Sequence, residues 1–149
     1  MNDQQRRLTG AHIIALTVFG EARGEAIEGQ VAVANVIRNR RRLGKWGPSF
    51  HDVCLAPWQF SCWMPQGGAE NHALLTDWAQ RLIDQPNPED ALMRQCLWIA
   101  QGLITDAFLD NTGRSTHYHA ATMNPRPRWA IDQVPRRQLA GHLFYGDIA

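Results

Sequence analysis

The sequence has little that would place the protein in a membrane, in a disulfide-bonded scaffold or on nucleic acid. No apolar run reaches the roughly 18 residues that span a bilayer, so we expect no membrane insertion. The opening stretch MNDQQRRLTG has no apolar segment after its arginines, so we expect no signal peptide and synthesis in the cytoplasm. The three cysteines, an odd number without a CxxC pair, predict neither a disulfide framework nor a zinc site, and we expect free buried thiols.

Excess charge of one sign is also absent. The formal net charge is +1, so we expect no nucleic acid partner. One local basic run, residues 38–42, admits two interpretations: the cationic end of a helix, or a contact with an anionic polymer. With 149 residues, 44% of them apolar, the chain has the size and composition of one ordinary domain, and we expect a monomer whose single domain covers residues 1–149.

Four segments show the apolar spacing of helices. They are 11–23 with Thr9 as N-cap, about 29–42, about 71–85, and a stretch that opens with Asn87 as N-cap and Pro88 in its first turn. Residues 44–69, rich in Gly, Pro and Trp, predict a long ordered loop. Beyond residue 110, turn residues surround a short alternating stretch typical of a small hairpin. The predicted fold is therefore mainly α with a small β element.

A carboxylate lies on the buried face of the first predicted helix. Ile14, Val18 and Glu21 fall at i, i+4 and i+7, which is one side of a helix. Partial desolvation there would raise the pKa of Glu21. A carboxylic acid protonated near neutral pH is what glycosidic bond cleavage requires, as in lysozyme. A buried ion pair of Glu21 with Arg23 or Arg40 is the alternative, and spacing alone leaves both open.

Glycines and further acids surround this glutamate. Gly20 and Gly24 leave room for a substrate or a neighbouring backbone, and Gly24 can end the helix in a left-handed conformation. Glu25 and Glu28 stand close to the next predicted helix, where acids stabilise the N-terminus, so we expect them to cap it.

The segment WQFSCW suits a glycan groove. Aromatic faces stack on sugar rings, and amide and hydroxyl groups bond acetamido substituents. The predicted substrate-binding residues here are Gln59, Phe60, Ser61 and Trp63, in a segment that begins with Trp58. The alternative is that Phe60 and one of the tryptophans belong to the core.

In the segment THYH, His117 and His119 would share one face of a strand. No third ligand follows at a familiar interval, so we expect no metal. A neutral histidine or Tyr118 could bond the substrate or orient Glu21, and we expect Tyr118 and His119 in the cleft. A purely structural hydrogen bond is the alternative.

No second carboxylate is convincing as a catalytic partner. Asp106, Asp110 and Asp132 fall in contexts typical of a helix end, a turn and a loop. A single acid is compatible with transglycosylation, in which the C6 hydroxyl of the substrate attacks, whereas a hydrolase more often needs a second carboxylate.

Four segments resemble the SleB-like cell wall hydrolases, the family of the spore-cortex-lytic enzymes, in the same order along the chain. They are FGEARGEAIEGQVAVANVIRNR, CLAPWQFSCW, STHYHAATMNPRPRWA and GHLFY. The resemblance implies a lysozyme-like domain that cleaves peptidoglycan between N-acetylmuramic acid and N-acetylglucosamine without a cofactor. It implies that Glu21 is the catalytic glutamate.

These observations together predict a lytic transglycosylase that acts on the cell wall. Without a signal peptide, such an enzyme would reach the wall after release from the cytoplasm, as a phage endolysin does. A hydrolytic muramidase at the same site, a metal-dependent amidase that uses the histidines, and a non-catalytic glycan-binding module are the alternatives.

Overall fold

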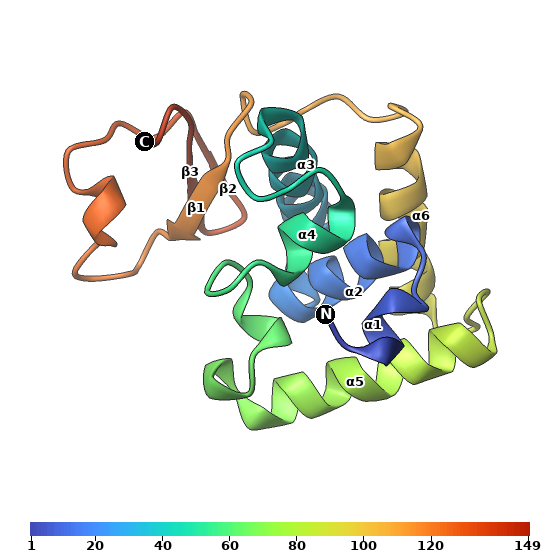
Figure 1. The fold of residues 1–149 in the computed structure, drawn as a ribbon. Helices are drawn as coiled ribbons and strands as arrows, with labels where there is room; N and C mark the ends of the chain where they lie inside the picture. The colour runs from blue at the N-terminus through green and yellow to red at the C-terminus, as the bar shows by residue number, and fades with distance from the viewer.

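Six α-helices and a three-stranded sheet make up the structure, a computed structural model that describes residues 1–149 (Figure 1). The helices are α1 (Asp3–Arg6), α2 (Gly10–Ala22), α3 (Ile27–Leu43), α4 (Phe50–Leu55), α5 (Ala69–Asp84) and α6 (Ala91–Ile104). Three short 3-10 turns are η1 (Ser61–Trp63), η2 (Pro65–Gly67) and η3 (Arg128–Ala130). The strands are β1 (His117–Ala120), β2 (Arg137–Leu139) and β3 (His142–Tyr145). The predicted mainly α fold with a small β element is confirmed.

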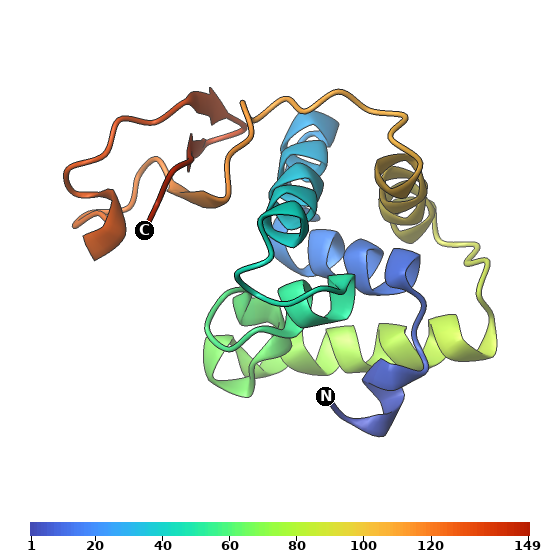
Figure 2. The same ribbon diagram turned by 45° about the horizontal axis from the view of Figure 1, so that its top comes forward.

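Helix α2 is the centre of the helical body. It packs against α3, α4, α5 and α6 (Figure 2). Nine of its thirteen residues are buried. A helix that is apolar on nearly all sides is stable only when other elements surround it. Its start follows the prediction, because the Thr9 side chain accepts a hydrogen bond from the backbone N–H of His12 at 3.0 Å. None of the helices combines the length and the apolar character needed to cross a membrane.

The four predicted helices are present as α2, α3, α5 and α6, but two details were wrong. Helix α6 begins at Ala91, because the Asp90 side chain, and not Asn87, accepts from the N–H of Met93. The predicted loop 44–69 contains α4, whose Ser49 and Asp52 form a capping box. This six-residue helix is too short to show a periodic pattern, so the capping box was the only signal for it.

The sheet forms a separate lobe beside the helical body (Figure 1). Its strand order is β1-β3-β2, all antiparallel, with Tyr118 opposite Phe144. One face of β3 joins a small core of Ala130, Leu143, Tyr145 and Ile148. The other face places Phe144 on Ala32 and Val36 of α3. Alternation along a single strand thus gives the lobe its own core and docks it on α3.

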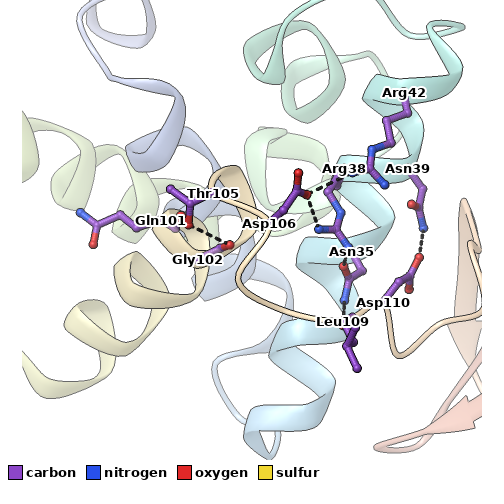
Figure 3. Close-up of polar contacts among 10 residues, drawn as sticks. All are labelled: Asn35, Arg38, Asn39, Arg42, Gln101, Gly102, Thr105, Asp106, Leu109 and Asp110. Atoms are coloured by element: carbon purple, nitrogen blue, oxygen red, sulfur yellow. Dashed lines mark hydrogen bonds and ion pairs between the residues drawn. The ribbon is translucent and has the colours of Figure 1, made fainter.

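A polar network holds the connection from α6 to the lobe against α3 (Figure 3). Arg38 and Arg42 both donate to Asp106, at 3.0 and 3.1 Å, and Asn39 donates to Asp110 at 2.8 Å. The basic run therefore lies at a helix end and anchors the connection. These contacts account for Arg38 and Arg42 without an anionic polymer.

The glycines of the first motif have different surroundings. A Cβ at Gly20 would lie 2.5 Å from the Cβ of Cys62, so glycine here allows η1 to pack against α2. At Gly24 nothing lies within 4 Å of an added Cβ, and its φ is not left-handed, so the prediction that it ends the helix in that conformation was wrong. Helix α2 ends at Ala22, and its C-cap Arg23 has helical φ. All three cysteines are free and buried, as predicted.

Substitution of Gly20 tests this packing. We expect Gly20→Ala to lower the free energy of unfolding by about 1–3 kcal/mol, because the added methyl group overpacks the contact with Cys62. Gly24→Ala is the matched control and should change stability by no more than about 0.5 kcal/mol. Urea denaturation measures both, and equal effects of the two substitutions would contradict the packing argument.

Candidate active site

Glu21 lies in the last turn of α2, at the edge of the buried core. Val18, one turn earlier, is fully buried, and the side chain of Glu21 is half-buried. Burial raises the pKa of Glu21 from its ordinary 4.5 to about 7, against the opposing effects of a hydrogen bond from Tyr118 and the charge of Arg40. The carboxyl group therefore holds its proton up to neutral pH, as its place on the helix face predicts.

Strand β1 brings Tyr118 to this carboxyl group. The Tyr118 hydroxyl donates to Oε1 of Glu21 at 3.5 Å. Burial and the neighbouring Glu21 raise the pKa of Tyr118 well above its ordinary value, so the hydroxyl keeps its proton and remains a donor. The ring packs on Phe144 and meets the edge of His142, which fixes its direction.

Arg40 is a buried cation near the same carboxyl group, but it forms no ion pair with Glu21. Its Nε donates to the carbonyl of Thr116 at 2.7 Å, and its guanidinium lies over the rings of Trp46 and Phe60. Its Nη1 is buried without a hydrogen-bond partner. Burial lowers the pKa of Arg40 to about 10, so it stays charged at neutral pH.

Arg23, the other alternative ion-pair partner, donates instead to the side chain of Asn71 at 2.7 Å. The structure thus contains neither of the ion pairs that would have given Glu21 a purely structural role. That interpretation of the sequence was wrong.

Glu25 also departs from its prediction. The N-cap of α3 is Ala26, without a side-chain cap, and Glu25 instead contacts Nδ1 of His142 at 2.9 Å. Gly29 makes room for this carboxylate, since a Cβ there would lie 2.4 Å from its Oε2. Glu28 does lie in the first turn of α3, where an acid favours the helix dipole.

The acids considered as catalytic partners have structural contacts. Asp106 pairs with two arginines, and Asp110 accepts hydrogen bonds from Thr112, Asn39 and Arg114. Asp132 is exposed on the far lobe, beyond η3. None of these three carboxylates is available beside Glu21.

The segment 58–63 lies next to the end of α2, because η1 packs against that helix. Phe60 is only 1% exposed, so its predicted contact with substrate is wrong and it belongs to the core. Trp63 is half-buried, and its indole N–H donates to Thr17 at 2.9 Å. Gln59 is half-buried and Ser61 is exposed, so both keep surface for a ligand.

The two histidines of β1 face away from Glu21. His119 is 5% exposed, and its Nε2 lies 2.9 Å from the hydroxyl of Tyr145, on which its ring is stacked. Because side chains alternate along a strand, His117 and His119 project from one face of β1 and Tyr118 projects from the other. The structure therefore does not bring His119 into the site, and a structural hydrogen bond accounts for it.

His117 packs between Trp46 and Trp129, where burial lowers its pKa to about 4. The structure contains no group of three or more His, Cys, Asp or Glu side chains arranged to hold a metal ion.

The acid Glu21, the donor Tyr118 and the buried Arg40 all lie in the sequence segments that resemble the cell wall hydrolases. The structure brings them together where the helical body meets the β lobe. Residues 24–145 match the family model of the cell wall hydrolases. The chain belongs to the cell wall hydrolase family. It is therefore a lytic enzyme of the peptidoglycan wall, as predicted. The matched range begins just after Glu21, so it does not itself cover that residue.

Two solved structures share the fold. The catalytic domain of the germination-specific lytic transglycosylase SleB from Bacillus anthracis is 23% identical, with a TM-score of 0.61 over 97% of this chain and 95% of that chain. The catalytic domain of the Bacillus cereus SleB protein is 23% identical, with a TM-score of 0.62 over 91% of this chain and 88% of that chain. Among curated proteins none is significantly similar. The predicted lysozyme-like fold of this cell wall hydrolase is thereby confirmed.

The charge of Arg40 gives a test of the electrostatics. We expect Arg40→Met to raise the pKa of Glu21 above 7, because the substitution removes a cation that favours the carboxylate. Arg41→Met is the matched control, since Arg41 is exposed and lies over Phe50. NMR titration of the labelled side-chain carboxyl groups measures the pKa, and an unchanged value in Arg40→Met would contradict the assignment.

The raised pKa of Glu21 also has a consequence for stability. Between pH 4.5 and about 7 the folded carboxyl group holds a proton that the unfolded one has lost, so stability falls as the pH rises through this window. Glu21→Gln cannot ionise. Its free energy of unfolding should exceed that of the wild type above neutral pH, by up to about 3 kcal/mol, and should equal it in acid. Denaturation at both pH values measures the difference, and a variant less stable at high pH would refute the burial argument.

Proposed function

We propose that this cell wall hydrolase cleaves the glycan strand of peptidoglycan between N-acetylmuramic acid and N-acetylglucosamine, as a lytic transglycosylase with Glu21 as its single general acid and base. One observation carries the proposal: Glu21 is half-buried with a pKa of about 7, beside the hydroxyl of Tyr118. A carboxyl group in this state can give a proton and take one back near neutral pH.

The reaction follows from these side chains. Glu21 gives its proton to the glycosidic oxygen, the bond from that oxygen to C1 of the muramic acid breaks, and an oxocarbenium-like centre develops. The Glu21 carboxylate then takes the proton of the C6 hydroxyl, whose oxygen bonds to C1 and closes a 1,6-anhydro ring. The charge of Arg40 stabilises the carboxylate between the two steps, and the Tyr118 hydroxyl holds its Oε1.

The surroundings of Glu21 favour transglycosylation over hydrolysis. A hydrolase usually uses a second carboxylate to activate water or to trap the sugar. Glu25, four residues after Glu21, contacts His142, and Asp106 and Asp110 have structural contacts. The Bacillus anthracis protein with this fold is itself described as a lytic transglycosylase.

We further propose that Gln59, Ser61, Trp63 and Tyr118 line the substrate cleft. The docking of the lobe on α3 through Phe144 supports a single catalytic domain over residues 1–149. We also propose that the enzyme acts as a monomer and reaches the wall after release from the cytoplasm, as an endolysin does.

Mass spectrometry of fragments released from purified peptidoglycan tests the reaction. We expect anhydromuramic ends from the wild type, and a loss of activity of about 10²–10⁴-fold in Glu21→Gln, because the amide cannot transfer a proton. Glu28→Gln, which alters an exposed acid on α3, is the matched control and should keep full activity.

The other outcomes identify the alternatives. Reducing muramic ends would make the enzyme a muramidase at the same site. Free peptides from intact glycan, with loss of activity on chelation, would indicate a metal-dependent amidase. Saturable wall binding without any release would indicate a glycan-binding module, and a fully active Glu21→Gln would refute the role of Glu21.

A further inference from the structure

Trp58 is the most exposed of the six tryptophans. Its side chain is 75% exposed, whereas Trp63, five residues later, is half-buried and bonded to Thr17. The Trp58 ring stacks on no aromatic ring or guanidinium of the chain, and its indole N–H donates to no protein group. Tryptophan normally buries most of its surface, so this exposure calls for an explanation.

The backbone at Trp58 is also unfavourable. Its φ of +63° lies in the left-handed region, which bulky residues rarely adopt. Strain of this kind persists only where the surrounding structure holds it, and it concentrates at ligand sites. Exposure and strain are two independent costs of placing a tryptophan at this position.

The position of Trp58 relates it to Glu21. Two residues later, Phe60 is buried under the guanidinium of Arg40, and Cys62 fills the space left by Gly20, next to Glu21. Four residues span at most about 14 Å, so Trp58 lies close to the site. The segment between α4 and η1 projects from the side of the helical body that carries the β lobe, in both views (Figures 1 and 2).

We propose that Trp58 is a stacking platform for a sugar ring of the glycan strand, at a subsite removed from the cleaved bond. The proposal rests on the proposed function, because it takes the glycan as the ligand. The carbon–hydrogen face of a pyranose ring is apolar and flat, and it suits an indole that is already presented to solvent. Gln59 and Ser61, in the same segment, keep exposed surface, and an amide and a hydroxyl can bond acetamido groups. A platform held in a strained conformation is ordered before the ligand arrives, which reduces the entropy lost on binding.

Substitution by glycine separates this role from a structural one. Glycine adopts a φ of +63° without strain, so Trp58→Gly should melt no lower than its parent. Its affinity should nevertheless fall roughly tenfold, because the stacking surface is gone. Trp58→Phe keeps an aromatic face and should restore most of the affinity.

The affinity is measured by calorimetry in the Glu21→Gln background, with glycan strands freed of their peptides as the probe. Trp98→Ala is the matched control, because Trp98 is 56% exposed and belongs to α6. That helix lies on the side of the helical body away from the segment between α4 and η1 (Figure 1). It should leave the dissociation constant unchanged.

Weaker binding by Trp58→Gly alone, with an undiminished melting temperature, supports the platform. Unchanged affinity overturns it. A parallel loss of melting temperature and affinity, or an equal loss in Trp98→Ala, overturns it as well. Because the probe is bound and not cleaved, these outcomes are separate from those of the fragment analysis, where failure to release glycan would refute the proposed function itself.

Discussion

The burial of α2 on nearly every side is the constraint on which the rest of the structure depends. Four helices pack around it, and its buried residues continue into its last turn. There Glu21 lies between the buried Val18, three residues earlier, and the buried Ala22. A carboxyl group at this boundary loses enough water to hold its proton near pH 7 and still reaches the surface. The chemistry proposed for Glu21 therefore depends on its place at the edge of the buried core. With less burial, its pKa would stay near the ordinary value of a glutamate.

The β lobe completes the site, although it contributes little to the main core. Phe144 docks the lobe on α3, and the polar network around Asp106 and Asp110 holds the connection that leads to it. With both in place, β1 directs Tyr118 at Glu21, while its two histidines turn into the core of the lobe. One four-residue strand thus supplies a donor to the site on one face and structural contacts on the other.

Much of the helical body could be predicted from the sequence, because helix periodicity and capping are local. The N-cap at Thr9, the buried face through Val18 and the partial burial of Glu21 all follow from spacing within a few turns. Helix α4 escaped prediction because six residues carry no periodic signal. The assignment of Phe60 to the cleft failed for a different reason: an aromatic residue suits a core and a sugar site equally well, and composition cannot separate them.

The sequence by itself determined the family, the fold class and the position of one acid on a buried helix face. Only the tertiary structure decided what surrounds that acid. Arg40 was one of two alternative ion-pair partners of Glu21, yet its guanidinium lies over aromatic rings. Glu25 was expected to cap α3, yet it contacts His142 of the lobe. Likewise, exposure distinguishes Trp58 from Trp63 within one short segment. The apolar periodicity of a helix is a property of residues close together in the sequence. These contacts instead join residues far apart in the chain, so they arise only when the lobe and the helices pack together.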